Sequence, residues 1–328
     1  MQHFVFAAID KTGMRIRHFS MASKRNFPVS RNINYLSLIL IAFFFTACAG
    51  GGSSSTQAVN DYTAFGNPEI VTINGYIGDI MEPFISRDGT WLFFNDNAKD
   101  IFYATFVNPT TFNYAGPITA INTSAVDGTP SLDNVASKFY YISTANYNIP
   151  PGTYDTLYSG TWDGNTVTGS AALTGLASTT PGFVDFDIEV SPDGSTIYFN
   201  EGDFSGGNNF PDADEIIIAV DSGGGFVRIP DSANIMANVN TANLEYAPAI
   251  SADGLELFFT RLDLGTMKTG IYRAARTNTS NPFGVPQLVS AIAGFVEGPT
   301  LSPDEKSLYY HKQNTNTGTF ELYRVTRP

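Results

Sequence analysis

Seven carboxylic acids are the residues best suited to chemistry in this chain, because they recur at one place in a repeated pattern. Each lies two to six residues before a Ser or Asp that marks the repeat, and all except Glu297 lie an even number of residues before it. Alternate residues of a strand point to the same face, so we expect six of these side chains to gather on one side of a sheet. The seven are Glu82, Asp127, Asp185, Asp187, Glu189, Glu245 and Glu297.

Three kinds of site could use such a group of acids. Two carboxylic acids at a suitable separation can hydrolyse a glycoside. The acids available for those roles are Glu82, Asp127, Asp187 and Glu245. Calcium takes several oxygen ligands, which the closely spaced Asp185, Asp187 and Glu189 could provide. The third interpretation is a solvated acidic rim, which attracts cations or cationic partners through its field alone.

Several other chemistries are excluded by what the sequence lacks. Cys48 is the only cysteine, and His311 is the only histidine after residue 18, so His-rich and Cys-rich zinc sites cannot form. We expect His311 to be an ordinary core or surface histidine. No Gly-x-Ser-x-Gly motif of a serine hydrolase occurs. A second set of recurring acids has the spacing of tight turns and no catalytic role. These turn acids are Asp88, Asp193, Asp253 and Asp304.

Length and composition favour a fold made of many short strands. The chain has 328 residues, of which 43% are hydrophobic and 15% charged, so it can bury a large core. Its 30 Gly, 18 Pro, 26 Phe and 16 Tyr suit strands and turns better than helices. The net charge of −13 opposes binding to phosphate backbones, so nucleic acid is not an expected partner.

A five-fold repeat organises the chain after its first 62 residues. Each copy has a Ser or Asp marker, a turn, and then a strand that is apolar almost without alternation. Such a strand must be covered on both faces, as in the blades of a propeller. The spacings of 47, 58, 60 and 51 residues between markers suit four-stranded blades with variable loops. The markers are Ser86, Asp133, Ser191, Ser251 and Ser302.

The sequence therefore predicts an all-β fold, a five-bladed β-propeller closed by an N-terminal strand in the last blade. The last copy is too short for a fourth strand, whereas residues 67–73 precede the first copy and have no blade of their own. Pairing these two ends would remove two open sheet edges. The fourth strands of the other blades are expected near residues 112–120, 166–173, 226–230 and 285–290. Prolines that share one repeat position are expected on the inner strand edge, where a missing N–H costs little. They are Pro83, Pro130, Pro248 and Pro299.

The repeat also resembles a known family. The pattern Pro-x-x-Ser-Pro-Asp-Gly, followed by an aromatic strand and then Asp-Ile-Tyr, resembles the WD40-like β-propeller repeats of TolB-type periplasmic proteins. The resemblance covers about residues 67–328. It implies a propeller fold and does not by itself imply an activity. TolB-type proteins usually close six blades and carry an additional N-terminal domain, whereas this sequence accommodates five repeats and shows no such domain.

The first 47 residues have the order of a secretory signal. Lys24, Arg25 and Arg31 precede an apolar run at residues 36–45, and small residues follow it. The sequence Phe45-Thr46-Ala47-Cys48 resembles a bacterial lipobox, in which the cysteine becomes the lipid-modified N-terminus.

This resemblance implies a lipid anchor on Cys48 and removal of residues 1–47. The expected parts are then the signal, a Gly- and Ser-rich tether at residues 48–62, and the propeller at residues 63–328. Loss of the signal would leave 12 basic and 30 acidic residues. Ala49 after the cysteine resembles the sorting pattern of outer-membrane lipoproteins.

We therefore expect a lipid-anchored propeller of the bacterial cell envelope, periplasmic or surface-facing. Its expected role is a scaffold that binds a protein partner or another ligand without catalysis. No cofactor is expected, although calcium on the acids is left open. The alternative is a five-bladed glycoside hydrolase that uses the carboxylates at the channel mouth.

Overall fold

The computed structural model describes residues 61–135, 137–147, 154–206 and 210–328. The predicted signal, Cys48 and most of the tether lie outside these residues. Within the described ranges, no helix is long and apolar enough to cross a membrane. A short helix, α1 (Ser232–Ile235), precedes the fourth blade.

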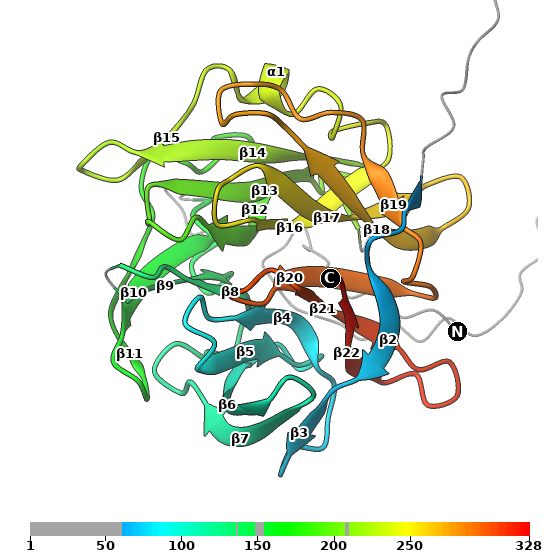
Figure 1. The fold of residues 1–328 in the computed structure, drawn as a ribbon. Coiled ribbons are helices and arrows are strands. Elements are labelled where there is room, and N and C mark those ends of the chain that lie inside the picture. The colour runs from blue at the N-terminus through cyan, green and yellow to red at the C-terminus, as the bar shows by residue number, and fades with distance from the viewer. Residues whose placement is uncertain (1–60, 136, 148–153, 207–209) are drawn as a thin grey trace, which may run out of the picture. The chain divides into compact units, whose positions relative to one another are not determined.

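Five sheets form a ring, and each contains the strands of one repeat (Figure 1). Blade 1 contains β4 (Met81–Ile85), β5 (Trp91–Asn95), β6 (Ile101–Asn108) and β7 (Thr111–Pro117). Blade 2 contains β8 (Asp127–Leu132), β9 (Lys138–Ser143), β10 (Leu157–Trp162) and β11 (Val167–Ala172). Blade 3 contains β12 (Phe183–Val190), β13 (Thr196–Asp203), β14 (Ala213–Asp221) and β15 (Phe226–Arg228). Blade 4 contains β16 (Leu244–Ile250), β17 (Glu256–Asp263), β18 (Lys268–Ala275) and β19 (Gln287–Val289). Blade 5 contains β20 (Val296–Leu301), β21 (Ser307–Gln313), β22 (Phe320–Thr326) and β2 (Gly66–Ile70). The chain is a five-bladed β-propeller.

The N-terminal strand closes this ring. β2, drawn in blue, pairs antiparallel with β22, the last strand of the chain (Figure 1). Across this pair, the Nε atom of Arg324 donates a hydrogen bond of 3.0 Å to Oε2 of Glu69. The prediction that residues before the first repeat complete the fifth blade is confirmed.

The N-terminal segment also contacts the two blades beside blade 5, which was not predicted. β3 (Thr72–Asn74) lies parallel to β7 at the outer edge of blade 1. β1 (Asp61–Tyr62) lies parallel to β19 at the outer edge of blade 4. Residues 72 and 73 therefore belong to blade 1 and not to blade 5. These short parallel strands cover edges whose N–H and C=O groups would otherwise be unpaired.

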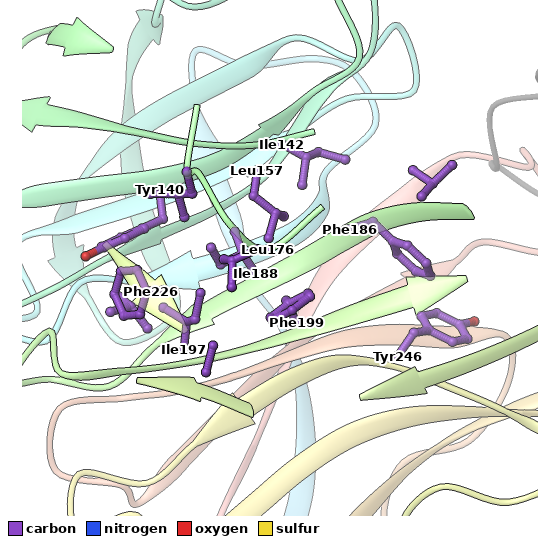
Figure 2. Packing of buried hydrophobic residues seen from close by; sticks show 14 of the residues in the cluster. Tyr140, Ile142, Leu157, Leu176, Phe186, Ile188, Ile197, Phe199, Phe226 and Tyr246 are labelled. Atoms are coloured by element: carbon purple, nitrogen blue, oxygen red, sulfur yellow. The ribbon is translucent and has the colours of Figure 1, made fainter. Parts of the chain in front are cut away.

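The second strand of each blade is buried on both faces, as its continuous apolar sequence predicts. In β5, the side chains of Leu92, Phe93 and Phe94 are completely buried. Figure 2 shows how side chains of blade 2 pack against side chains of blade 3. The residues in this contact include Tyr140, Ile142, Leu157, Ile188, Ile197 and Phe199. Packing of this kind on both faces fixes the inner strands around the axis.

The repeated acids of the turns have the structural role that their spacing predicts. In blade 3, the hydroxyl of Ser191 donates to Asp193 at 2.6 Å, and the amide of Ser195 donates at 3.0 Å. These hydrogen bonds hold the pKa of the Asp193 carboxyl below its ordinary value. The serine hydroxyl makes the same hydrogen bond to the turn acid in three other blades. The other turn acids are Asp88, Asp253 and Asp304.

Candidate functional site on the propeller axis

Every innermost strand contains a β-bulge at the same place. Two residues of this strand lie opposite one residue of its neighbour, and the first of the two has a positive φ. The left-handed conformation costs non-glycine residues about 1–3 kcal/mol, and such residues gather at functional sites. The five positions, with their φ values, are Glu82 (47°), Thr129 (49°), Asp187 (51°), Ala247 (51°) and Gly298 (62°).

The bulges change where the predicted acids point. An extra residue in a strand reverses the alternation of side chains beyond it. Acids that lie six residues before the marker are therefore not expected on the same face as Glu189, which lies two residues before it and after the bulge. The structure separates the seven acids into three groups according to their place in the chain. Four acids precede the bulge, Glu82 and Asp187 are bulge residues, and Glu189 follows the bulge.

The three acids that lie six residues before the marker are buried, and each accepts hydrogen bonds from other groups of the protein. Oε1 of Glu245, which is completely buried, accepts a hydrogen bond of 2.6 Å from Nε of Arg261. Asp185 accepts one of 3.3 Å from Arg228, and its burial raises its pKa to about 8. Oδ2 of Asp127 accepts the amide of Thr123 at 2.5 Å. Asp127, also completely buried, has its pKa raised by that burial.

Glu189 joins four blades from a position near the axis. Its carboxylate accepts hydrogen bonds from Arg87 of blade 1 at 2.5 Å, from the hydroxyl of Ser131 of blade 2 at 3.0 Å, and from the amide of Ile250 of blade 4 at 3.3 Å. Burial raises the pKa of Glu189, and the Arg87 guanidinium partly offsets the rise. Side chains from three blades and a backbone amide of a fourth therefore meet at this carboxylate.

His311 is a buried connector between blades 5 and 1. Its Nδ1 atom accepts the amide of Glu82 at 2.9 Å, so the ring proton of the neutral side chain is on Nε2. Nε2 then donates to Oε2 of Glu297 at 3.1 Å, and the hydroxyl of Tyr246 donates to Oε1 of the same carboxylate. His311, expected to be a core or surface histidine, is buried and contacts both Glu82 and Glu297.

The His311 position is used in the same way in other blades. Oδ1 of Asn95 accepts the amide of Thr129 at 3.1 Å, and Oγ1 of Thr260 accepts the amide of Gly298 at 3.1 Å. Each contact runs from the end of a second strand to the bulge residue of the next blade. The sequence signal for this contact is a polar residue nine positions after the marker.

The bulge residues surround a small cavity on the axis, which we call the axial cavity. Its volume is about 40 Å³. All five bulge residues, Glu82, Thr129, Asp187, Ala247 and Gly298, line it. Apolar walls come from the residues that follow the bulge positions. These are Pro83, Pro130, Ile188, Pro248 and Pro299.

The two carboxyl groups of the axial cavity are electrostatically linked. Burial raises the pKa of Asp187 well above its ordinary value, and the charge of Glu82 adds to the rise. Burial also raises the pKa of Glu82, which the nearby His311 partly offsets. Two like charges in a poorly solvated space favour binding of a proton or another cation between them.

The acidic trio on β12 does not form one site. Asp185 points to Arg228, Glu189 points to Arg87, and Asp187 lines the axial cavity at the bulge. In the part of the chain that the structure describes, no group of three or more His, Cys, Asp or Glu residues could hold a metal ion.

Comparison with known proteins shows similarity of fold alone. No protein-family model matches the chain, and no curated protein matches it. A putative exo-β-1,3-galactanase from Bifidobacterium bifidum s17 is 13% identical with a TM-score of 0.53, over 80% of this chain and 96% of that one. The catalytic domain of the GH62 α-L-arabinofuranosidase from Coprinopsis cinerea is 12% identical with a TM-score of 0.51, over 82% and 97%. TolB from Acinetobacter baumannii is also among the similar structures, at 13% identity and a TM-score of 0.44, over 76% of this chain and 54% of that one.

Proposed function

We propose that this protein is a lipid-anchored propeller of the bacterial cell envelope that binds a partner protein or another ligand and catalyses no reaction. The main support is the size of the axial cavity, which Glu82 and Asp187 line. Sites for drug-sized or sugar-sized ligands have volumes of about 300–1,000 Å³. The axial cavity, at about 40 Å³, is too small for a sugar ring.

The glycoside hydrolase alternative is weakened by the positions of its candidate acids. Asp127 and Glu245 are completely buried, so neither can reach a substrate in solution. The two tryptophans do not form a sugar-binding surface, because the rings of Trp91 and Trp162 pack edge to face at 5.6 Å between blades 1 and 2. Only Glu82 and Asp187 are left for an acid and base pair.

An oligosaccharide assay tests the absence of catalysis. The purified protein is incubated with arabino-oligosaccharides and galacto-oligosaccharides, and new reducing ends are measured. We expect no release above the buffer level. Release that disappears in Asp187→Asn but persists in Asp193→Asn would show a hydrolase and reject the proposal.

The envelope location rests on the sequence of the leader, and a cysteine variant tests it. Wild-type protein should sediment with the membranes, and Cys48→Ala should move to the soluble fraction because it has no site for the lipid. Blocking lipoprotein signal cleavage with globomycin should retard the wild-type band on a gel and leave the variant unchanged. Equal membrane association of both proteins would contradict the anchor.

A further inference from the structure

We propose that the axial cavity binds a primary ammonium group at the end of an unbranched carbon chain, as in a lysine side chain or an alkylamine. This inference rests on the proposed binding function and names the site and the chemical class of its ligand. It comes from the hydrogen-bond acceptors, the missing counter-charge and the shape of the cavity.

The axial cavity offers three acceptors, which is the number of N–H donors on a primary ammonium. Two are the carboxylates of Glu82 and Asp187. The third is the hydroxyl of Thr129, a residue that is only 7% exposed. Its Oγ1 atom has no hydrogen-bond partner among the described residues. Leaving a buried hydroxyl unbonded is costly, so a ligand that donates to Oγ1 would be stabilised.

The two axial carboxylates differ in charge balance from three other buried acids. Glu189, Glu245 and Asp185 each form an ion pair with an arginine. Among the residues that the structure places, no Lys or Arg forms an ion pair with Glu82 or Asp187. A cationic ligand would supply to Glu82 and Asp187 the positive charge that arginine side chains supply to the other three acids.

Lys99 is the nearest candidate for an internal counter-charge. Its charge partly offsets the rise in the pKa of Glu82. Burial lowers the pKa of Lys99, and the charge of Glu82 opposes this shift. Lys99 therefore does not replace a ligand positioned between the two carboxylates.

The shape of the axial cavity favours an unbranched carbon chain on the ammonium ligand. Its walls are proline rings and the side chain of Ile188, which suit methylene groups. Glu82 and Ala247 are only half-buried, so solvent reaches the cavity beside them. The small volume, about 40 Å³, favours a narrow ammonium group over a branched one. A calcium ion would require more oxygen ligands than two carboxylates and a hydroxyl.

Titration of the full-length protein in detergent tests the site with n-butylammonium and tert-butylammonium, which carry the same charge. We expect n-butylammonium to bind about tenfold or more tightly than the branched amine. Asp187→Asn should weaken its binding by about tenfold, because a charged hydrogen bond is lost. The matched control Asp193→Asn removes a carboxylate outside the cavity and should leave the affinity unchanged.

Two further variants separate hydrogen bonding from shape. Thr129→Val removes the acceptor hydroxyl and should weaken n-butylammonium binding by about threefold to tenfold. Ala247→Leu fills the cavity without changing its charge and should abolish binding. Circular dichroism checks that each variant is folded. A misfolded Ala247→Leu would leave the comparison of Thr129→Val with wild type as the deciding result.

Other outcomes would overturn the ammonium site. Equal affinity for the two amines, or unchanged affinity in a folded Asp187→Asn variant, would show that only a diffuse field attracts cations. An increase in Tm with calcium that is lost in Asp187→Asn, with no effect of n-butylammonium, would assign the cavity to a metal. In each case, the absence of oligosaccharide hydrolysis would still agree with the proposed binding function.

A final comparison distinguishes the two sources of the ammonium group. N-acetyl-lysine methylamide presents a lysine side chain within a peptide-like backbone, and n-butylammonium presents the amine alone. Tighter binding of the lysine derivative indicates a partner protein that inserts a lysine. Tighter binding of n-butylammonium indicates a free alkylamine, and either order supports the site.

Discussion

Arg87→Met should destabilise the propeller by about 3–5 kcal/mol, because it leaves the buried carboxylate of Glu189 without its counter-charge. Arg87 is the only cation in ion-pair contact with Glu189 among the residues that the structure describes. The same carboxylate bonds Ser131 and Ile250, so its movement would disturb contacts among four blades. Urea unfolding followed by tryptophan fluorescence measures the change.

Two variants serve as controls for Arg87→Met. The double variant Arg87→Met with Glu189→Leu removes both charges and should recover most of the lost stability. Arg324→Met breaks the pair with Glu69, whose side chain is 47% exposed, and should cost about 1 kcal/mol or less. A loss in Arg87→Met no greater than that in Arg324→Met would contradict the role of Glu189 as a junction of the blades.

The effect of Arg87→Met should decrease in acid. Burial raises the pKa of Glu189 in the folded protein, and loss of Arg87 raises it further. A carboxyl group with a raised folded pKa takes up a proton more readily in the folded state, so its burial destabilises mainly above the unfolded pKa of about 4.3. The difference in unfolding free energy between wild type and Arg87→Met should therefore be smaller at about pH 4 than at about pH 7.

His311→Leu should reduce the unfolding free energy by about 2–4 kcal/mol, because it leaves two partly buried polar groups without a partner. These are the amide of Glu82 and one oxygen of Glu297. The contact joins the last blade to the first, so the ring should open more easily. Hydrogen exchange of the β2 and β22 amides should become faster, together with the fall in urea midpoint.

The other blades provide a rescue variant for this position. Asn95 stands at the equivalent place in blade 1 and accepts the amide of Thr129. His311→Asn should therefore keep the hydrogen bond to Glu82 and lose only the one to Glu297. Its destabilisation should be about half that of His311→Leu. If both variants were equally unstable, packing of the ring, which lies edge to face against Phe320 at 5.2 Å, would be its main role.

The candidate site could be predicted from the sequence only in part. The even spacing of the acids placed them near the axis, but it assumed a regular strand. The repeated bulge breaks that regularity, so Asp127, Asp185 and Glu245 bond within the blades, while Glu82 and Asp187 face the cavity. A bulge depends on how two strands pair, and the residue types at its position range from Glu to Gly. Sequence alternation alone could not locate it.

Thr129 shows what an alignment of the repeats could have added. It lies four residues before its marker, the position of Glu82 and Asp187, and it completes the set of acceptors in the axial cavity. Its residue type gives no functional signal, because threonine is common in strands. The absence of a partner for its hydroxyl depends on neighbours from other blades, so only the folded chain reveals it.

The sequence by itself determined the number of blades, the doubly buried second strands, the acidic turns and the closure of the ring by the N-terminal segment. These features follow from periodic hydrophobicity and local turn chemistry, which act over a few residues. The tertiary structure alone decided which acids are neutralised, which residue joins the last blade to the first, and what lines the axis. Those properties arise where strands from different blades meet, because charge, burial and hydrogen bonding there depend on side chains that are distant in the sequence.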